Sequence, residues 1–268
     1  HADKARGFPN LGNTCYINAV VQCLFHCAPF RNDLELQPAG ASFMGDCLKN
    51  LWTTYKVESA SQLDLQPPLL ALVQQILRHT GFAGGIQQDA AECLMHLLQS
   101  VDGGRMQQRV CGAYAVASLE NMILCRTTAV AHVSRNAPSV SMGQMLVAAL
   151  TDDQAMQEDP AALVVRVENI YEQQEQYFAV DAVADWDVDP LEFSMLGNVE
   201  STATYRVAGY VAHVHNGDVD AMQRMRSGHY VAYLHVGGAW YEANDTSITR
   251  AEGSPASFPY IRFLDSWL

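Results

Sequence analysis

The stretch that decides the fold lies near the N-terminus, where residues 7–24 read GFPNLGNTCYINAVVQCL. Its first half is rich in glycine, proline and asparagine, which are typical of turns. Apolar side chains then recur at the spacing of one helix face, at Ile17, Val20, Val21, Leu24 and Phe25. The sequence therefore predicts a loop and then a helix that begins near Cys15 and is stopped by Pro29.

The rest of the chain divides into a helical part and a strand part. Helical periodicity continues over residues 43–56, 67–79 and 88–99, whereas residues 100–200 have no clear period. Two acidic stretches in that middle region, 152–159 and 181–192, are interpreted as solvated loops. After residue 199 the period changes to two, which predicts strands over 205–214, 229–236 and 239–244. Helices followed by antiparallel strands predict an α+β fold.

The last two predicted strands are joined by Gly237-Gly238, a strong signal for a two-residue hairpin turn. In that register Val231 faces Asn244, and His229 lies on the same face as Asn244, within reach of a cross-strand neighbour. Asp245 is expected to point away from this face unless a bulge intervenes. The hairpin therefore predicts an imidazole with an amide beside it to orient the ring.

Composition and charge limit the possible functions. The chain has 268 residues, with 16 Lys and Arg against 29 Asp and Glu, for a net charge of −13. This charge disfavours binding to nucleic acid or to anionic membranes. No apolar run approaches the roughly 20 residues of a membrane span. The start, HADKARGFPN, lacks both Met and an apolar signal core. We therefore expect an artificial boundary there, and an intracellular protein of the cytoplasm or nucleus.

The cysteines suggest one reactive thiol. There are seven, an odd number, and no C-x-x-C pair, so neither a disulfide framework nor a common structural zinc site is indicated. Most are expected to be reduced and buried. Cys15 differs because it lies at a predicted helix start, where unpaired N–H groups and the helix dipole favour a thiolate. A thiolate is the nucleophile of a cysteine hydrolase.

Three segments resemble the ubiquitin-specific protease family. Residues 7–24 resemble its cysteine box, and residues 87–94, QQDAAECL, look like its Q-Q-D-A-x-E-F-L segment. Residues 227–233, SGHYVAY, together with 240–245, WYEAND, are similar to its histidine box. The three segments also occur in the family's order. The resemblance is close over residues 7–30, 86–99 and 199–250 and weaker in the middle, where residues 160–167 resemble the strand that leads back from the fingers to the palm.

The resemblance implies a papain-like cysteine protease fold with a helical thumb, an antiparallel β palm and short fingers. It implies one catalytic domain over residues 1–268. The thumb would cover about 7–100, the fingers and part of the palm about 101–200, and the palm with the histidine box about 201–268. The implied activity is thiol-dependent cleavage after the C-terminal glycine of ubiquitin, and the implied partners are ubiquitin and its conjugates.

The family's functional residues carry over position by position. The resemblance implies Cys15 as the nucleophile, His229 as the general base and Asn244 as the third catalytic residue, with charge supplied by the neighbouring Asp245. Asn10 matches the residue that stabilises the oxyanion. Asp89 matches the acidic residue that holds the ubiquitin tail. The full set of implied substrate-binding residues is Asp89, Glu92, Gln88, Gly228 and Tyr230.

Two departures from the family pattern matter. Many members bind zinc through two C-x-x-C pairs in the fingers. Here Cys125 stands where the first pair would begin, but Thr128 occupies the position of its second cysteine, and the second pair is missing. We therefore expect no metal and no cofactor. The third catalytic position is Asn244 rather than the more frequent Asp, and an amide can still fix the tautomer of the imidazole.

Two alternatives stay open. One is a non-catalytic ubiquitin-binding relative that keeps the fold. The other is a protease for another ubiquitin-like modifier, because motifs that read a Gly-Gly terminus do not distinguish modifiers from one another.

The missing C-x-x-C pairs predict that chelators leave activity and thermal stability unchanged, because a structural zinc needs about four ligands. The measurement is thermal unfolding and hydrolase activity with and without a chelator, together with the metal content of the purified protein. Stoichiometric zinc would contradict the prediction.

Overall fold

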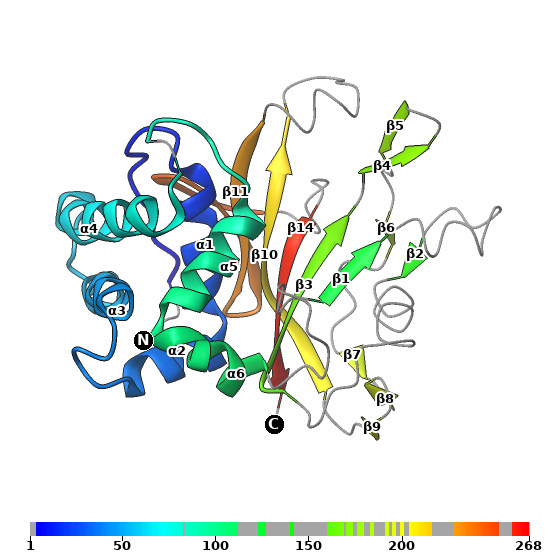
Figure 1. Cartoon of the computed structure of the whole chain (residues 1–268), viewed down its shortest axis with the longest axis horizontal. Helices are drawn as coiled ribbons and strands as arrows, with labels where there is room; N and C mark the ends of the chain where they lie inside the picture. Colours follow the sequence, from blue (N-terminus) through cyan, green and yellow to red (C-terminus); the bar gives the residue numbers. More distant parts are fainter. Residues whose placement is uncertain are drawn as a thin grey trace.

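The computed structural model describes residues 4–82, 84–111, 123–126, 140–141, 160–168, 170–173, 176–179, 183–184, 191–192, 195–196, 199–200, 204–215, 228–251 and 259–267. The helices lie on one side of a large sheet (Figure 1). The α+β prediction is therefore confirmed. The acidic stretch 152–159 and most of the stretch 181–192 lie outside the described residues.

The described helices all belong to the first 111 residues. They are α1 (Cys15–His26), α2 (Ala28–Leu36), α3 (Phe43–Tyr55), α4 (Gln62–Thr80), α5 (Ala90–Ser100), the 3-10 helix η1 (Asp102–Gly104) and α6 (Arg105–Cys111). The predicted helices near Cys15 and over 43–56, 67–79 and 88–99 correspond to α1, α3, α4 and α5. The sequence pattern missed α2 and α6.

Helix α4 begins earlier than predicted, at Gln62, because a capping box precedes it. The Ser61 hydroxyl accepts a hydrogen bond from the Asp64 N–H, and the Asp64 carboxylate accepts one from the Ser61 N–H. Pro67 and Pro68 consequently lie inside the helix rather than at its start. Pro29 does follow the end of α1, and it lies in the first turn of α2, where a missing N–H costs little.

The main sheet has the strand order β1-β3-β14-β10-β11-β12-β13, and β7 also pairs with β10. Its strands are β1 (Ile123–Arg126), β3 (Ala162–Glu168), β7 (Leu191–Glu192), β10 (Thr204–Val214), β11 (His229–Val236), β12 (Ala239–Asn244), β13 (Ser247–Arg250) and β14 (Pro259–Trp267). Only the β1–β3 pair in this sheet is parallel among the described strands.

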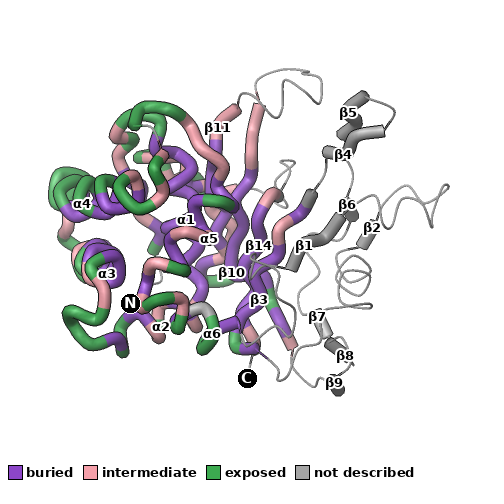
Figure 2. The backbone as a smooth tube through the Cα atoms, viewed as in Figure 1, coloured by how far each residue is buried: buried purple, intermediate pink, exposed green. Residues whose placement is uncertain are grey.

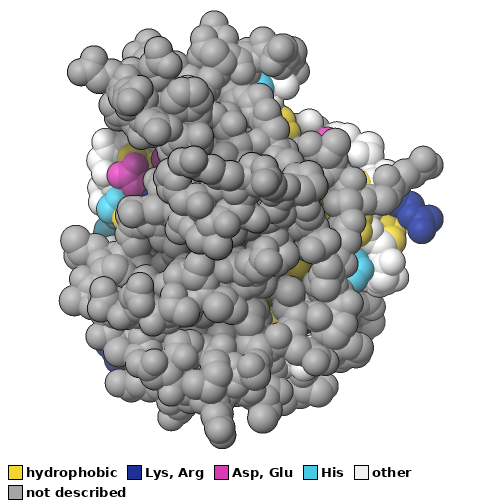
Figure 3. All heavy atoms as spheres, turned by 90° about the vertical axis from the view of Figure 1, so that its right-hand side faces the viewer, with side chains coloured by type: hydrophobic (Ala, Val, Ile, Leu, Met, Phe, Trp, Pro, Cys, Tyr) yellow, Lys and Arg dark blue, Asp and Glu magenta, His cyan; other side chains and the backbone are white. Residues whose placement is uncertain are grey.

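Three further strand pairs stand apart from this sheet. They are β2 (Val140–Ser141) with β6 (Val183–Ala184), β4 (Ile170–Gln173) with β5 (Gln176–Ala179), and β8 (Met195–Leu196) with β9 (Val199–Glu200). Figure 3 shows the face of the molecule that lies to the right in Figure 1. The described side chains visible there are of mixed kinds, and none of these kinds forms a continuous patch.

The predicted hairpin between β11 and β12 is confirmed. Tyr233 faces Glu242 and Ala232 faces Ala243. Gly237 and Gly238 have φ angles of 58° and 77°, the positive values that a two-residue turn of this kind requires. The register that relates His229 to Asn244 is therefore the one expected from the sequence.

Helix α1 is the centre of the core. Every residue of α1 is buried, and the helix packs against α5 on one side and against β10 and β11 on the other (Figure 2). A helix buried on all sides must satisfy its polar side chains internally. Gln22 does so by accepting a hydrogen bond from the Tyr55 hydroxyl and donating one to the Arg6 carbonyl. None of the described helices combines the length and the apolar character needed to cross a membrane.

The N-terminal loop docks on the turn between β12 and β13. The Phe8 N–H donates to the Asp245 carbonyl at 2.8 Å. Gly7 lies so close to the next residue of the turn that a Cβ there would be 2.3 Å from the Thr246 carbonyl oxygen. This contact brings the segment before Cys15 against the segment that follows Asn244.

Gly7→Ala should destabilise the protein, because the added Cβ would collide with backbone atoms that cannot rotate away. Overpacking of this kind costs about 1–3 kcal/mol, so we expect a lower Tm in thermal unfolding. Gly84→Ala is the matched control, since a Cβ there meets only Leu77 Cδ1, at 3.9 Å. Equal losses of Tm in the two variants would contradict the close docking of the loop.

Candidate active site

Cys15 is the first residue of α1 and is almost fully buried. The loop before it is held by its own polar atoms. The Asn10 side-chain oxygen accepts from the Gly12 N–H at 3.0 Å and from the Thr14 N–H at 3.2 Å, and the Thr14 hydroxyl accepts from the Leu11 N–H at 2.9 Å. This folding presents the Cys15 sulfur at a helix N-terminus, where backbone N–H groups lack intrahelical partners.

His229 begins β11 and lies beside Cys15. Its Nε2 is 2.8 Å from the Asn244 side-chain oxygen, so the imidazole and the amide meet as the hairpin predicted. The pKa of His229 is raised to about 9. The largest cause is a hydrogen bond with the Cys15 side chain. Burial opposes this rise, while the Asn244 hydrogen bond and the charges of Cys15 and Asp245 add to it. The environment therefore favours an imidazolium beside the sulfur at neutral pH.

The expectation that Asp245 points away from His229 is wrong. Its Oδ2 is 3.9 Å from His229 Nε2. The reason is local. Asp245 has a φ of 49° in the turn after β12, so the alternation of strand side chains ends at Asn244, without the bulge that the sequence argument required.

The Asp245 carboxylate also ties the loop and α1 to this turn. Its Oδ2 accepts from the Asn10 amide at 2.9 Å, and its Oδ1 accepts from the Asn18 amide at 2.8 Å. Asn18 is buried in α1 and donates to the Pro9 carbonyl as well, at 3.2 Å. The sequence reasoning missed Asn18, although its position three residues after Cys15 puts it one turn further along the same helix.

Asp89 lies in a cluster with two tyrosines. As the N-cap of α5, its Oδ1 accepts from the Glu92 N–H at 2.8 Å, and its Oδ2 accepts from the Tyr260 hydroxyl. Tyr230 lies next to Tyr260, with ring centroids 6.2 Å apart. Burial, and then the charge of Asp89, raise the pKa values of both tyrosines. The structure thus connects α5 with β11 and β14.

Glu92 and Gln88, the other two candidates from the α5 segment, have no described contact with Tyr230 or Tyr260. Glu92 is exposed, and its carboxylate lies 3.8 Å from His96 Nε2 rather than in the Asp89 cluster. Gln88 is half-buried immediately before Asp89. The structure therefore brings Asp89, and not Glu92, against the sheet.

Gly228 leaves room for two imidazoles. Its φ is 150°, and a Cβ there would lie 2.4 Å from His213 Nε2 and 2.8 Å from His215 Cε1. His213 stacks on Tyr230 with ring centroids 4.3 Å apart, and burial, followed by the charge of His215, lowers the pKa of His213 to about 4. The sequence reasoning missed Tyr260 and also His213, which the β10–β11 register pairs with Tyr230. Residues 215–228 separate the two strands, so no tight turn fixes this register in the sequence.

The described cysteines other than Cys15 are buried and unbridged, as expected for ordinary core residues: Cys23, Cys27, Cys47, Cys93 and Cys111. Among the residues that the structure describes, no group of three or more His, Cys, Asp or Glu side chains could hold a metal ion. The side chain of Cys125 lies outside the described part of the chain.

Comparison with known proteins identifies the family. The model of the family described as ubiquitin carboxyl-terminal hydrolase matches residues 6–263. The chain belongs to the ubiquitin carboxyl-terminal hydrolase family. The match includes the Cys15 loop, the Asp89 segment and the β11–β12 hairpin.

Similar hydrolases come from distant organisms. The chain is 30% identical over 122 residues to ubiquitin carboxyl-terminal hydrolase 12 of Salmo salar, covering 43% of this chain and 32% of that protein. It is 32% identical over 100 residues to hydrolase 29 of Homo sapiens, covering 36% of this chain and 11% of that protein. The chain thus matches a third or less of the length of these two relatives.

Solved structures show the same fold. The SAGA Ubp8/Sgf11/Sus1/Sgf73 DUB module bound to ubiquitin aldehyde matches with a TM-score of 0.73 and 14% identity, covering 100% of this chain and 70% of that chain. The same module bound to monoubiquitin, with a substituted Ubp8, matches with a TM-score of 0.74, also at 14% identity and with the same coverage. The α+β fold of this hydrolase family member is therefore the papain-like fold of those catalytic domains.

Cys15→Ala should lower the pKa of His229 from about 9, because the hydrogen bond with Cys15 is the largest cause of its elevation. Asn244→Ala should lower it by a smaller amount. The measurement is a pH titration of the histidine side-chain resonances by NMR. His26, at the far end of α1, is the internal control, since burial and Arg31 lower its pKa to about 4 without any contribution from Cys15. An unchanged His229 titration in Cys15→Ala would contradict the pairing.

Proposed function

We propose that this chain is a thiol-dependent deubiquitinase that hydrolyses the peptide or isopeptide bond after the C-terminal glycine of ubiquitin. The observation that carries the proposal is the pairing of Cys15 with His229, whose other partner is the Asn244 amide oxygen at 2.8 Å. A cysteine at a helix N-terminus, an adjacent imidazole and a group that orients the imidazole form the set that nucleophilic acyl transfer needs. Membership of the hydrolase family supports the same activity.

In the proposed mechanism, His229 takes the proton of Cys15 and holds the thiolate as an ion pair. Since Nε2 faces Asn244, Nδ1 is the nitrogen available to the sulfur. The thiolate attacks the carbonyl carbon of the last ubiquitin glycine, and the electron pair of the C=O bond moves onto the oxygen. The tetrahedral intermediate then collapses to a thioester as the imidazolium protonates the departing amine. Water, deprotonated by His229, hydrolyses the thioester and releases Cys15.

The oxyanion would be stabilised by backbone N–H groups at the start of α1 and by the Asn10 amide. The nitrogen of that amide carries two N–H donors, and Asp245 accepts one of them at 2.9 Å. Asp245 would therefore hold Asn10 in place while the second N–H turns to the substrate. A single donor of this kind can contribute about 3 kcal/mol to transition-state stabilisation.

The ubiquitin tail would approach past Asp89. Its carboxylate is fixed by Tyr260 and the α5 backbone, so it can receive a basic side chain of the tail without first being ordered. Gly228 and Tyr230 would line the narrow part of the path to Cys15, with Gln88 and Glu92 near the entrance. Residues of about 7–100 would form the thumb, about 101–200 the fingers and part of the palm, and about 201–268 the palm with the histidine box. For such an enzyme we propose an intracellular location and no nucleic-acid partner.

A fluorogenic C-terminal amide of ubiquitin tests this proposal. Wild-type protein should cleave it, and Cys15→Ala and Cys15→Ser should reduce kcat/KM to background while leaving the Tm unchanged. Cys47→Ala, at a second unbridged cysteine, is the matched control and should retain activity. Corresponding amides of other ubiquitin-like modifiers form the second arm of the assay.

Three results would overturn the proposal. Turnover in Cys15→Ala would mean that the nucleophile is another residue. Binding of ubiquitin without turnover by the wild type would indicate a non-catalytic relative. Faster cleavage of another modifier's amide would indicate a different substrate.

Substitutions of Asn244 and of Asp245 should have different effects on catalysis and on stability. Asn244→Ala should lower kcat because the imidazole loses its orienting hydrogen bond, and Asn244→Asp should keep or raise activity because a carboxylate also stabilises imidazolium. Asp245→Ala should lower the Tm as well, because the buried Asn18 amide loses an acceptor, which costs about 1–3 kcal/mol. The measurement is kcat/KM and Tm for the variants side by side. A greater loss of kcat/KM in Asp245→Ala, at equal folded fraction, would make Asp245 the orienting residue.

A further inference from the structure

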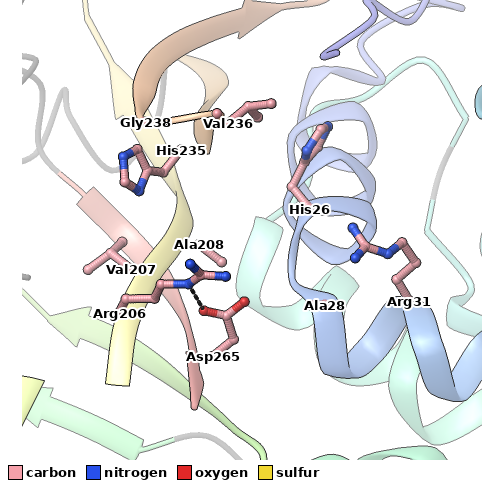
Figure 4. A pocket seen from close by; sticks show the side chains of 11 residues that line it. His26, Ala28, Arg31, Arg206, Val207, Ala208, His235, Val236, Gly238 and Asp265 are labelled. Carbon is pink, nitrogen blue, oxygen red and sulfur yellow. Dashed lines mark hydrogen bonds and ion pairs between the residues drawn. The ribbon is translucent and has the colours of Figure 1, made fainter. Parts of the chain in front are cut away.

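A polar pocket of about 310 Å³ lies at the opposite end of α1 from Cys15. It is bordered by the last residue of α1, the start of α2, the turn between β11 and β12, and strands β10 and β14 (Figure 4). Since α1 has 12 residues and rises about 1.5 Å per residue, the pocket is roughly 16 Å from the nucleophile. It is therefore separate from the candidate active site.

Two arginines face each other across this pocket. Arg31 reaches in from α2 and Arg206 from β10 (Figure 4). Arg206 Nε lies 3.0 Å from a carboxylate oxygen of Asp265, which is itself buried. Among the arginine and aspartate side chains that line the pocket, two guanidinium groups outnumber one carboxylate, in a chain whose net charge is −13. A local positive excess in so acidic a protein favours an anionic ligand.

Arg31 can still bind a ligand. Its guanidinium makes one long hydrogen bond, 3.5 Å from Nη1 to the Phe25 carbonyl oxygen, and lies 5.9 Å from the ring of Trp52. The charge of Glu35 also acts on Arg31, but the Glu35 carboxylate forms its ion pair with Lys56, at 3.1 Å. A guanidinium has five N–H donors arranged as a planar fork that matches a carboxylate in two parallel hydrogen bonds. The pocket also includes Ala28, the first residue of the nine-residue helix α2, where backbone N–H groups lack intrahelical partners.

The imidazole of His26 forms part of the wall without adding charge. Its Nε2 is 3.0 Å from the Tyr55 hydroxyl. Burial, and then the charge of Arg31, lower the pKa of His26 to about 4, so the ring is neutral at pH 7. The positive excess of the pocket at neutral pH therefore comes from its arginines.

We propose that this pocket is a binding site for a carboxylate group, which Arg31 receives in a paired hydrogen bond opposite the Arg206–Asp265 ion pair. One carboxylate neutralises the single excess charge, whereas a phosphate dianion would exceed it and would face the buried Asp265. The volume is at the lower end of the range for ligand pockets, which suits a carboxylate on a small acid or on the acidic side chain of a peptide. The proposal does not depend on the chemistry of Cys15.

The test is NMR titration of the ¹⁵N-labelled full chain at constant ionic strength. The probes are acetate, a terminally blocked Ala-Glu-Ala tripeptide and inorganic phosphate. Both carboxylate probes should give saturable shifts of the Arg31 Nε–H and of the Ala28 and Gly237 backbone N–H resonances. Tighter binding of the peptide would identify an acidic segment as the source, and tighter binding of acetate would identify a small free acid.

Arg31→Gln should weaken carboxylate binding by about tenfold or more, since it removes a charge-assisted hydrogen bond. Arg78→Gln, at an exposed arginine in the last turn of α4, loses the same charge and should bind as the wild type does. Spectra that match the wild type away from the pocket verify folding of both variants. Non-saturable shifts, equal affinity in Arg31→Gln, or tighter binding of phosphate than of either carboxylate would overturn the proposal.

Discussion

The carboxylate of Asp245 is the contact on which the geometry of the site depends. It accepts hydrogen bonds from Asn10 in the N-terminal loop and from Asn18 in α1, while its own backbone carbonyl accepts from Phe8. The N-terminal loop and α1, which are consecutive in the chain, are thereby joined to a turn that lies 227 residues after Asn18. Cys15 belongs to the second of these segments, and the strand that carries Asn244 ends at the turn. The distance between nucleophile and base is therefore set by these polar contacts as well as by packing.

The buried helix α1 extends this constraint across the molecule. Its N-terminus presents Cys15 and its last residue, His26, borders the arginine pocket. Polar side chains along it are paired with neighbouring elements, as Gln22 is with Tyr55. A helix held this way between α5 and the sheet has little freedom to move alone. A shift of α1 would therefore move Cys15 and His26 together.

Local sequence patterns predicted those parts of the fold whose physical cause is local. Helix α1 follows from its apolar period, and the approach of His229 to Asn244 follows from the glycine turn and strand alternation. Asp245 was misplaced because strand alternation does not apply to a residue with positive φ. His213 and Tyr260 were missed for a different reason. His213 meets Tyr230 across the β10–β11 pair, whereas Tyr260 meets Asp89 only where the sheet packs against α5.

Ubiquitin that bears a C-terminal electrophile tests most directly whether Cys15 is the nucleophile that meets the ubiquitin tail. Intact-mass measurement after incubation should show one ubiquitin adduct per chain, and peptide mapping should locate it at Cys15. Cys15→Ala should form no adduct, and Asn244→Ala should form it more slowly because the imidazole is less well oriented. An adduct at another cysteine such as Cys47, or no adduct with folded wild-type protein, would contradict the proposed chemistry.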